Sequence, residues 1–100
     1  MYASAFNATS DATLKRDIVP ISGALDTISR ITPVEYRFNL LDNETLHYGV
    51  LAQELEEKGL GDIVRHGNNG KLAVEYNSLT GLLLAAVKDL STQEAVNFAL

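Results

Sequence analysis

The sequence contains no cysteine and no tryptophan, and only two of its 100 residues are proline. Without cysteine there is no disulfide framework, no thiol nucleophile and no thiolate ligand for a metal ion. Any nucleophile in this chain must therefore be a hydroxyl, an amine or a carboxylate. The lack of cysteine is compatible with either an oxidising or a reducing compartment.

Positive charge is also scarce. Eight lysines and arginines face 13 aspartates and glutamates, which gives a formal net charge of -5 at pH 7. A negative chain repels phosphate, and no stretch gathers basic residues densely enough to override that repulsion. We therefore expect no nucleic-acid partner.

Targeting and membrane-spanning segments are missing as well. The opening residues "MYASAFNATS" lack a basic segment followed by an apolar one, and the apolar run "LTGLLLAAV" is too short to cross a bilayer. The sequence therefore predicts no membrane partner and contains no recognisable targeting signal.

What is present is the composition of one small folded domain. Hydrophobic residues make up 46% of the chain and charged residues 21%, which is typical of a soluble globular protein. One hundred residues is the length of a single domain, so the core will be small.

Three helices are indicated. Apolar residues recur at helical spacing from Ile21 to Ile31, with Ser22 as the candidate N-cap and Thr32-Pro33 as the stop. The segment "AQELEEKGLG" predicts a second short helix that ends at Gly59. A long C-terminal helix follows Ser78, its candidate cap.

Two hairpins are indicated between these helices. "VEYRFNL", residues 34–40, alternates apolar and polar side chains, and the turn "DNET" returns the chain into "LHYGVLA". "DIVRH" and "KLAVEYN" flank "GNNG", whose residues tolerate positive φ, so residues 62–77 predict the second hairpin. The expected fold class is α+β: a small single domain with two β-hairpins, two short helices and a long C-terminal helix.

The C-terminal helix has a partly apolar seam. Leu83, Val87 and Leu90 follow the 4-3 spacing of a heptad, but Glu94 and Asn97 occupy the next seam positions. This pattern excludes a long coiled coil. It suits packing against the domain's own sheet or a short oligomeric contact, and the pattern alone favours a core helix.

Most candidate sites are weak. His47 and His66 stand nineteen residues apart without a neighbouring histidine partner, so we expect no metal site and no cofactor. The acidic run at 54–57 is typical of a solvated helix face. "GNNG" lacks the lysine and following helix of a phosphate loop, which leaves it as a turn.

Ser10 and Lys15, in "SDATLKRDI", are the strongest pair. A lysine amine can act as general base to a serine hydroxyl when it is neutral, a form that burial favours. Five residues place two side chains roughly 140° apart on a helix and on opposite faces of a strand. A turn, or a neighbouring chain, must therefore bring them together. Spacing alone favours a simpler reading, in which Ser10 or Asp11 caps a turn and Lys15 is solvated.

Several segments together resemble one family. "SDATLKRDI", "LDTISRITPVEYRF", "YGVLAQELEE" and "LAVEYNSLTGLLLAAVKDL" resemble, in the same order, the blocks of the intramolecular chaperone auto-processing domains. These domains form the C-termini of phage tailspike and tail-fibre proteins such as endosialidases, and occur in the myelin regulatory factor. Thr13 departs from the pattern, because the family most often carries arginine there.

The resemblance implies a homotrimer that aligns an upstream fibrous client segment of the same polypeptide and then releases itself. Ser10 would be the nucleophile and Lys15 the base of a single-turnover serine peptidase. A hydroxyl that attacks the preceding carbonyl closes a five-membered ring, whereas its own carbonyl would require a four-membered one. Thr9-Ser10 is therefore the preferred scissile bond, and Ser10-Asp11 is the alternative.

The resemblance also predicts the domain boundaries and the setting. Residues 1–9 would be a leader or a remnant of the client, and residues 10–100 the chaperone domain, with the client expected upstream in the natural polypeptide. The domain would work in the host cytoplasm during phage assembly, and the client would end in the virion tail. Two alternatives stay open: a non-cleaving trimerisation or attachment module of the same fold, and an unrelated small α+β binding domain.

Overall fold

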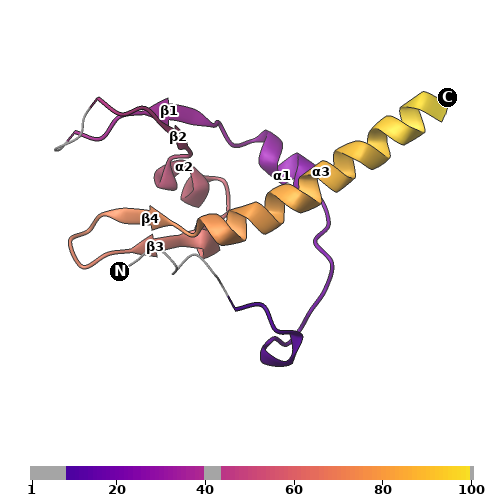
Figure 1. Ribbon diagram of the computed structural model, residues 1–100, viewed down its shortest axis with the longest axis horizontal. Helices are drawn as coiled ribbons and strands as arrows, with labels where there is room; N and C mark the ends of the chain where they lie inside the picture. The colour runs from indigo at the N-terminus through magenta and orange to yellow at the C-terminus, as the bar shows by residue number, and fades with distance from the viewer. Residues whose placement is uncertain (1–8, 40–43, 100) are drawn as a thin grey trace.

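The computed structural model describes residues 9–39 and 44–99, and the side chains among them as far as residue 93. Figure 1 shows a long helix that crosses the molecule, with two hairpins and two short helices gathered along its first half. In chain order the elements are η2 (Ala12–Leu14), α1 (Ala24–Ser29), β1 (Val34–Tyr36), β2 (His47–Gly49), α2 (Ala52–Glu57), η3 (Gly61–Ile63), β3 (Val64–His66), β4 (Leu72–Val74) and α3 (Tyr76–Ala99).

The strands form two separate two-stranded antiparallel sheets. β1 pairs with β2 so that Glu35 lies opposite Tyr48, and β3 pairs with β4 so that Arg65 lies opposite Ala73. The predicted fold class is therefore confirmed: an α+β domain with two hairpins, short helices and a long C-terminal helix.

The core lies where α2 meets the second hairpin and the segment after α1. Ile31, Ala52, Leu55 and Val64 form the buried cluster, and the Leu55 side chain is fully enclosed. Burying one leucine contributes roughly 1.5–3 kcal/mol, so such a cluster can hold together strands of only three residues.

α3 connects the rest of the body. One side of α3 packs against α1, and the small buried residues Ala24 and Ala86 belong to these two helices. At the start of α3 the Tyr76 hydroxyl accepts a hydrogen bond of 3.3 Å from the amide of Val50, which follows β2. α3 therefore contacts both the first hairpin and α1.

Residues 9–22 form an arm that leaves this body, and every one of them is exposed. Figure 1 shows the arm looping away below α1 and α3, with η2 near its outermost point. Leu14 is 74% exposed and Val19 76% exposed, although both side chains are apolar. We call residues 9–22 the N-terminal arm.

The predicted first helix is shorter than its sequence pattern and begins later. Its N-cap is Gly23 and not Ser22, and Gly23 has a φ of 70°, in the left-handed region that suits glycine. This glycine separates Ile21, which stays in the exposed arm, from the helix. The first strand is also shorter, because β1 ends at Tyr36; residues 40–43 of the predicted strand and turn lie outside the described residues.

The second hairpin is confirmed, with different ends. Its turn closes through the Gly67 amide, which donates to the Lys71 carbonyl at 2.9 Å, and Gly70 has a φ of 78°. The Glu75 amide donates to Ile63 at 2.7 Å, and the Glu75 carbonyl accepts from the Leu79 amide. α3 therefore begins at Tyr76, two residues before the predicted cap Ser78.

Candidate functional site

The strongest candidate site lies in the N-terminal arm, at η2. This single turn is closed by two backbone hydrogen bonds, from the Leu14 amide to the Asp11 carbonyl at 3.0 Å and from the Lys15 amide to the Ala12 carbonyl at 3.1 Å. The backbone is extended at Asp11 before the turn and at Lys15 after it. The chain therefore reverses over three residues and brings the two ends of the segment close together.

The turn places Lys15 against Ser10. The Lys15 Nζ donates a hydrogen bond to the Ser10 Oγ, and the two atoms are 2.7 Å apart. The spacing argument required a turn or a second chain for this contact, and within a single chain the turn is sufficient. A separation of 2.7 Å also suits transfer in the opposite direction, from the hydroxyl to a neutral amine.

The Asp11 side chain stabilises this turn by accepting two hydrogen bonds. One carboxylate oxygen, Oδ1, accepts from the Thr13 amide at 2.9 Å and from the Thr13 hydroxyl at 2.7 Å. The bond from the Thr13 amide, followed by that from the hydroxyl, lowers the pKa of Asp11 below its ordinary value. The capped turn and the serine–lysine contact, which were competing readings of the sequence, occur together.

The site is open to solvent in the single chain. Thr9, Ser10, Asp11 and Lys15 are all exposed, and no residue of η2 is buried. Solvent favours the ammonium form of an amine. The single chain therefore brings a hydroxyl and an amine into contact and leaves both exposed.

The histidines and glutamates have structural contacts. His66 Nε2 lies 2.7 Å from Glu56 Oε2. The His47 ring stacks on that of Tyr36, with centroids 5.5 Å apart, and meets the Phe38 ring edge-on, with centroids 5.0 Å apart. Among the described residues there is no group of three or more His, Cys, Asp or Glu side chains that could hold a metal ion.

The acidic run on α2 is not simply a solvated face, as its composition suggested. Glu54 accepts a hydrogen bond of 2.9 Å from the Thr32 amide, which ties α2 to the segment after α1. Glu56 reaches His66 on β3. Sequence reasoning missed both contacts, because each joins residues ten or more positions apart in different elements.

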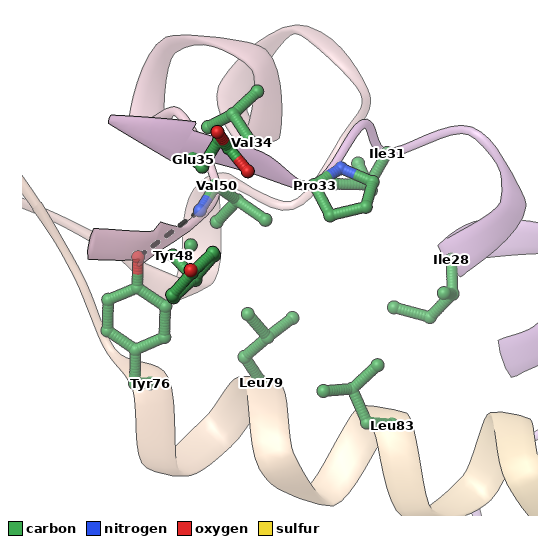
Figure 2. Close-up of a pocket in the computed structure, with 11 residues that line it drawn as sticks. Ile28, Ile31, Pro33, Val34, Glu35, Tyr48, Val50, Tyr76, Leu79 and Leu83 are labelled. Carbon is green, nitrogen blue, oxygen red and sulfur yellow. Dashed lines mark hydrogen bonds between the residues drawn. The ribbon is translucent and has the colours of Figure 1, made fainter. Parts of the chain in front are cut away.

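The body also contains an apolar cavity of about 550 Å³, between α1, the first hairpin and α3. Figure 2 shows Leu79 and Leu83 of α3 pointing into it opposite Ile28, with the Tyr76 hydroxyl bonded to Val50 at one end. Its charged lining residue is Glu35, and no lining residue comes from the arm. The cavity therefore has no nucleophile with an adjacent base, and it does not share a wall with Ser10.

In the part of the chain that the structure describes, no helix is long and apolar enough to cross a membrane. The part of the chain that the structure describes combines an α+β body with an exposed turn in which Lys15 contacts Ser10.

Comparison with known proteins assigns the family. The sequence model of the family described as "Chaperone of endosialidase", which is classed with the peptidases, matches residues 10–64. The match covers more than half of the chain and begins at Ser10, so the chain belongs to this family. No curated protein matches the sequence closely enough to add to the assignment. Membership supports a chaperone role and an association with a client, and it removes the alternative of an unrelated binding domain.

Proposed function

We propose that this domain is a C-terminal intramolecular chaperone that assembles as a homotrimer, promotes the folding of an upstream fibrous client, and then releases itself by autoproteolysis. The observation that carries the proposal is the 2.7 Å contact between Lys15 Nζ and Ser10 Oγ, in a chain whose family match begins at that serine. The client would be a phage tailspike or tail fibre. The domain would act in the host cytoplasm during phage assembly, and the client would end in the virion tail.

The proposed reaction begins with neutral Lys15. Its amine takes the Ser10 hydroxyl proton while Oγ attacks the carbonyl carbon of Thr9, which closes a five-membered ring. The bond between that carbon and the Ser10 nitrogen then breaks, the lysine returns its proton to the nitrogen, and the acyl group remains on Oγ as an ester. Water hydrolyses the ester, leaving a carboxylate on Thr9 and a free amine on Ser10.

This reaction needs no substrate pocket. Nucleophile, base and scissile carbonyl belong to one short segment, and well-oriented groups in one molecule reach effective concentrations of roughly 10⁵ M or more. That agrees with a site on an exposed turn, away from the apolar cavity. Each chain would turn over once.

The exposed face of α3 supports the trimer. Leu83, Leu84, Val87 and Leu90 are between 42% and 65% exposed in the single chain, although they are all apolar. Leu83, Val87 and Leu90 follow heptad spacing, which suits a short helix–helix seam between copies. α3 packs against α1 on the side that carries Ala86, and Leu83 also borders the apolar cavity, so the exposed surface of Leu84, Val87 and Leu90 is what remains available to a second copy.

Assembly would also activate the base. Packing of three chains around the arm would exclude water from Lys15 and favour its neutral amine. Cleavage would then occur only after correct assembly. With the chaperone removed, the client trimer would be kinetically trapped, because the species able to refold it no longer exists.

The test uses the domain joined to its natural upstream segment. Wild type, Ser10→Ala and Lys15→Ala are compared by gel and intact mass, and we expect cleavage in wild type alone, with a new amino terminus at Ser10. Persistent cleavage in both variants would exclude the serine–lysine pair. Light scattering at tens of micromolar tests the assembly, and a monomer there would contradict obligate trimerisation.

One observation favours a second function, a trimerisation or attachment module that does not cleave. Lys15 is exposed in the single chain, which lacks the burial that favours a neutral amine. An unchanged mass of the wild-type precursor in its assembled state would support this alternative.

A further inference from the structure

The contact between Ser10 and Lys15 depends on a turn whose hydrogen bonds, among the described residues, are all made within the N-terminal arm. Extended chain over five residues spans roughly 17 Å, farther than a lysine side chain reaches. η2 removes that separation with only two backbone hydrogen bonds, and none of its residues is buried. A single isolated helical turn is unstable in water, because it fixes several dihedral angles for very few hydrogen bonds.

The Asp11 and Thr13 side chains supply what the turn otherwise lacks. The two bonds that Thr13 donates to Asp11 Oδ1 add as many hydrogen bonds as the backbone of the turn makes. A capping side chain satisfies an amide that the first turn leaves without a partner. Both side chains lie between Ser10 and Lys15 in sequence. We call their two hydrogen bonds the lock, because they close the segment that must fold.

We propose that Asp11 and Thr13 are positioning residues for autoproteolysis: their paired hydrogen bonds close the turn that holds Lys15 Nζ against Ser10 Oγ. Neither residue touches the reacting atoms. Each acts by raising the fraction of chains in which base and nucleophile are in contact. The inference rests on the proposed function for its kinetic consequence, but its structural part is independent of cleavage.

Two substitutions of Asp11 distinguish the effect of its hydrogen bonds from the effect of its negative charge. Asp11→Ala removes both side-chain bonds, and from the usual strength of a cap we expect the cleavage rate to fall roughly five-fold. Asp11→Asn keeps an oxygen in the same place without the charge and restores the rate to within about two-fold, since asparagine caps as well as aspartate. Asp17→Asn is the matched control, because Asp17 is an exposed carboxylate in the same arm outside η2.

Thr13 provides an independent test. Thr13→Val keeps the amide and the side-chain shape but removes the hydroxyl, so one of the two bonds is lost. We expect a reduction of about two- to three-fold, roughly the value of part of a cap. Thr13→Ser restores the hydroxyl and the rate. Because the arm contributes nothing to the core, thermal unfolding and oligomeric state stay unchanged in all these variants.

The experiment measures two quantities on the precursor with its upstream segment: the cleavage rate by intact mass, and the nuclear Overhauser contact between Ser10 Hβ and Lys15 Hε protons. The second is recorded on the precursor that retains both Ser10 and Lys15, before cleavage has begun. Loss of rate and contact in Asp11→Ala, with recovery of both in Asp11→Asn, supports the lock. A wild-type rate in Asp11→Ala and Thr13→Val overturns it while the proposed function stands.

Two further outcomes are distinguishable. If wild type never cleaves, the proposed function fails, and the lock is judged by the proton contact alone: its persistence in Asp11→Ala overturns the inference. If Asp11→Asn is as slow as Asp11→Ala, the carboxylate charge is what matters, and the lock is likewise overturned.

Discussion

The carboxylate of Asp89 accepts a hydrogen bond of 3.2 Å from the amide of Leu25, 64 residues earlier in the chain. Leu25 is the second residue of α1, whose N-cap Gly23 makes no side-chain bond to the helix. An amide at this position has no partner inside its own helix. Asp89 therefore caps α1 from α3 and fixes where the two helices meet.

We expect Asp89→Ala to lower the free energy of unfolding by about 1 kcal/mol, the usual value of a lost cap. Urea denaturation provides the measurement. Asp89→Asn keeps an accepting oxygen and should recover most of the loss, and Lys88→Ala, at an exposed neighbouring position, should have little effect. Equal losses for the alanine and asparagine variants would contradict a capping role.

The sequence predicted those parts of the fold that depend on neighbouring residues. The turn between β3 and β4 and the end of α2 before Gly59 each have a local signal, and Gly59 and Gly70 have the positive φ that their positions require. The contacts of Asp89 with Leu25 and of Glu54 with Thr32 had no such signal, because they form only when distant elements meet.

The candidate site could be predicted from the sequence only in part. The sequence singled out Ser10 and Lys15 as candidates, and their spacing required either a turn or a second chain, but nothing in a five-residue separation specifies which turn forms. The signal that could have found it is Asp11 followed two residues later by Thr13, a pair able to bond locally and compete with regular structure.

The pH dependence of the turn follows from Asp11. The Thr13 amide first, and then the Thr13 hydroxyl, lower the pKa of Asp11 in the folded turn relative to the open chain. The part of the stabilisation that depends on the carboxylate charge is therefore complete above the ordinary pKa of an aspartate, and is lost as the pH falls through the lowered value. We expect the Thr13 amide resonance to titrate in that acidic range, and Asp11→Asn to abolish the titration.

Leu55 is the side chain on which the core depends most. It is completely buried at the centre of the cluster formed by α2 and the second hairpin. Leu55→Ala should cost about 2–5 kcal/mol, from lost burial and an unfilled cavity. Leu55→Met, which nearly conserves volume, should cost less than about 1.5 kcal/mol. Similar thermal midpoints for the two variants would contradict a tightly packed core.

Gly49 and Tyr76 should be coupled. A Cβ at position 49 would collide with the Tyr76 hydroxyl, which lies against the backbone at the end of β2. We expect Gly49→Ala to cost about 1 kcal/mol or more in wild type, as overpacking usually does. The same change should cost less in a Tyr76→Phe background, because the clashing oxygen is gone. A double-mutant cycle measures this difference, and strict additivity would contradict the contact.

The proposed trimer makes Val87 a sensitive position. Val87 is 62% exposed in the single chain and lies between Leu83 and Leu90 on the apolar seam of α3. Val87→Glu should therefore leave the folded body intact, as judged by circular dichroism, while three like charges at the seam oppose assembly. Light scattering should then report a monomer.

Lys88→Glu is the matched control, because it introduces the same side chain one residue away, beside the seam. If both variants remain trimeric, α3 does not hold the copies together through this face. If the Val87→Glu monomer also fails to cleave, assembly and activation of Lys15 are linked as proposed.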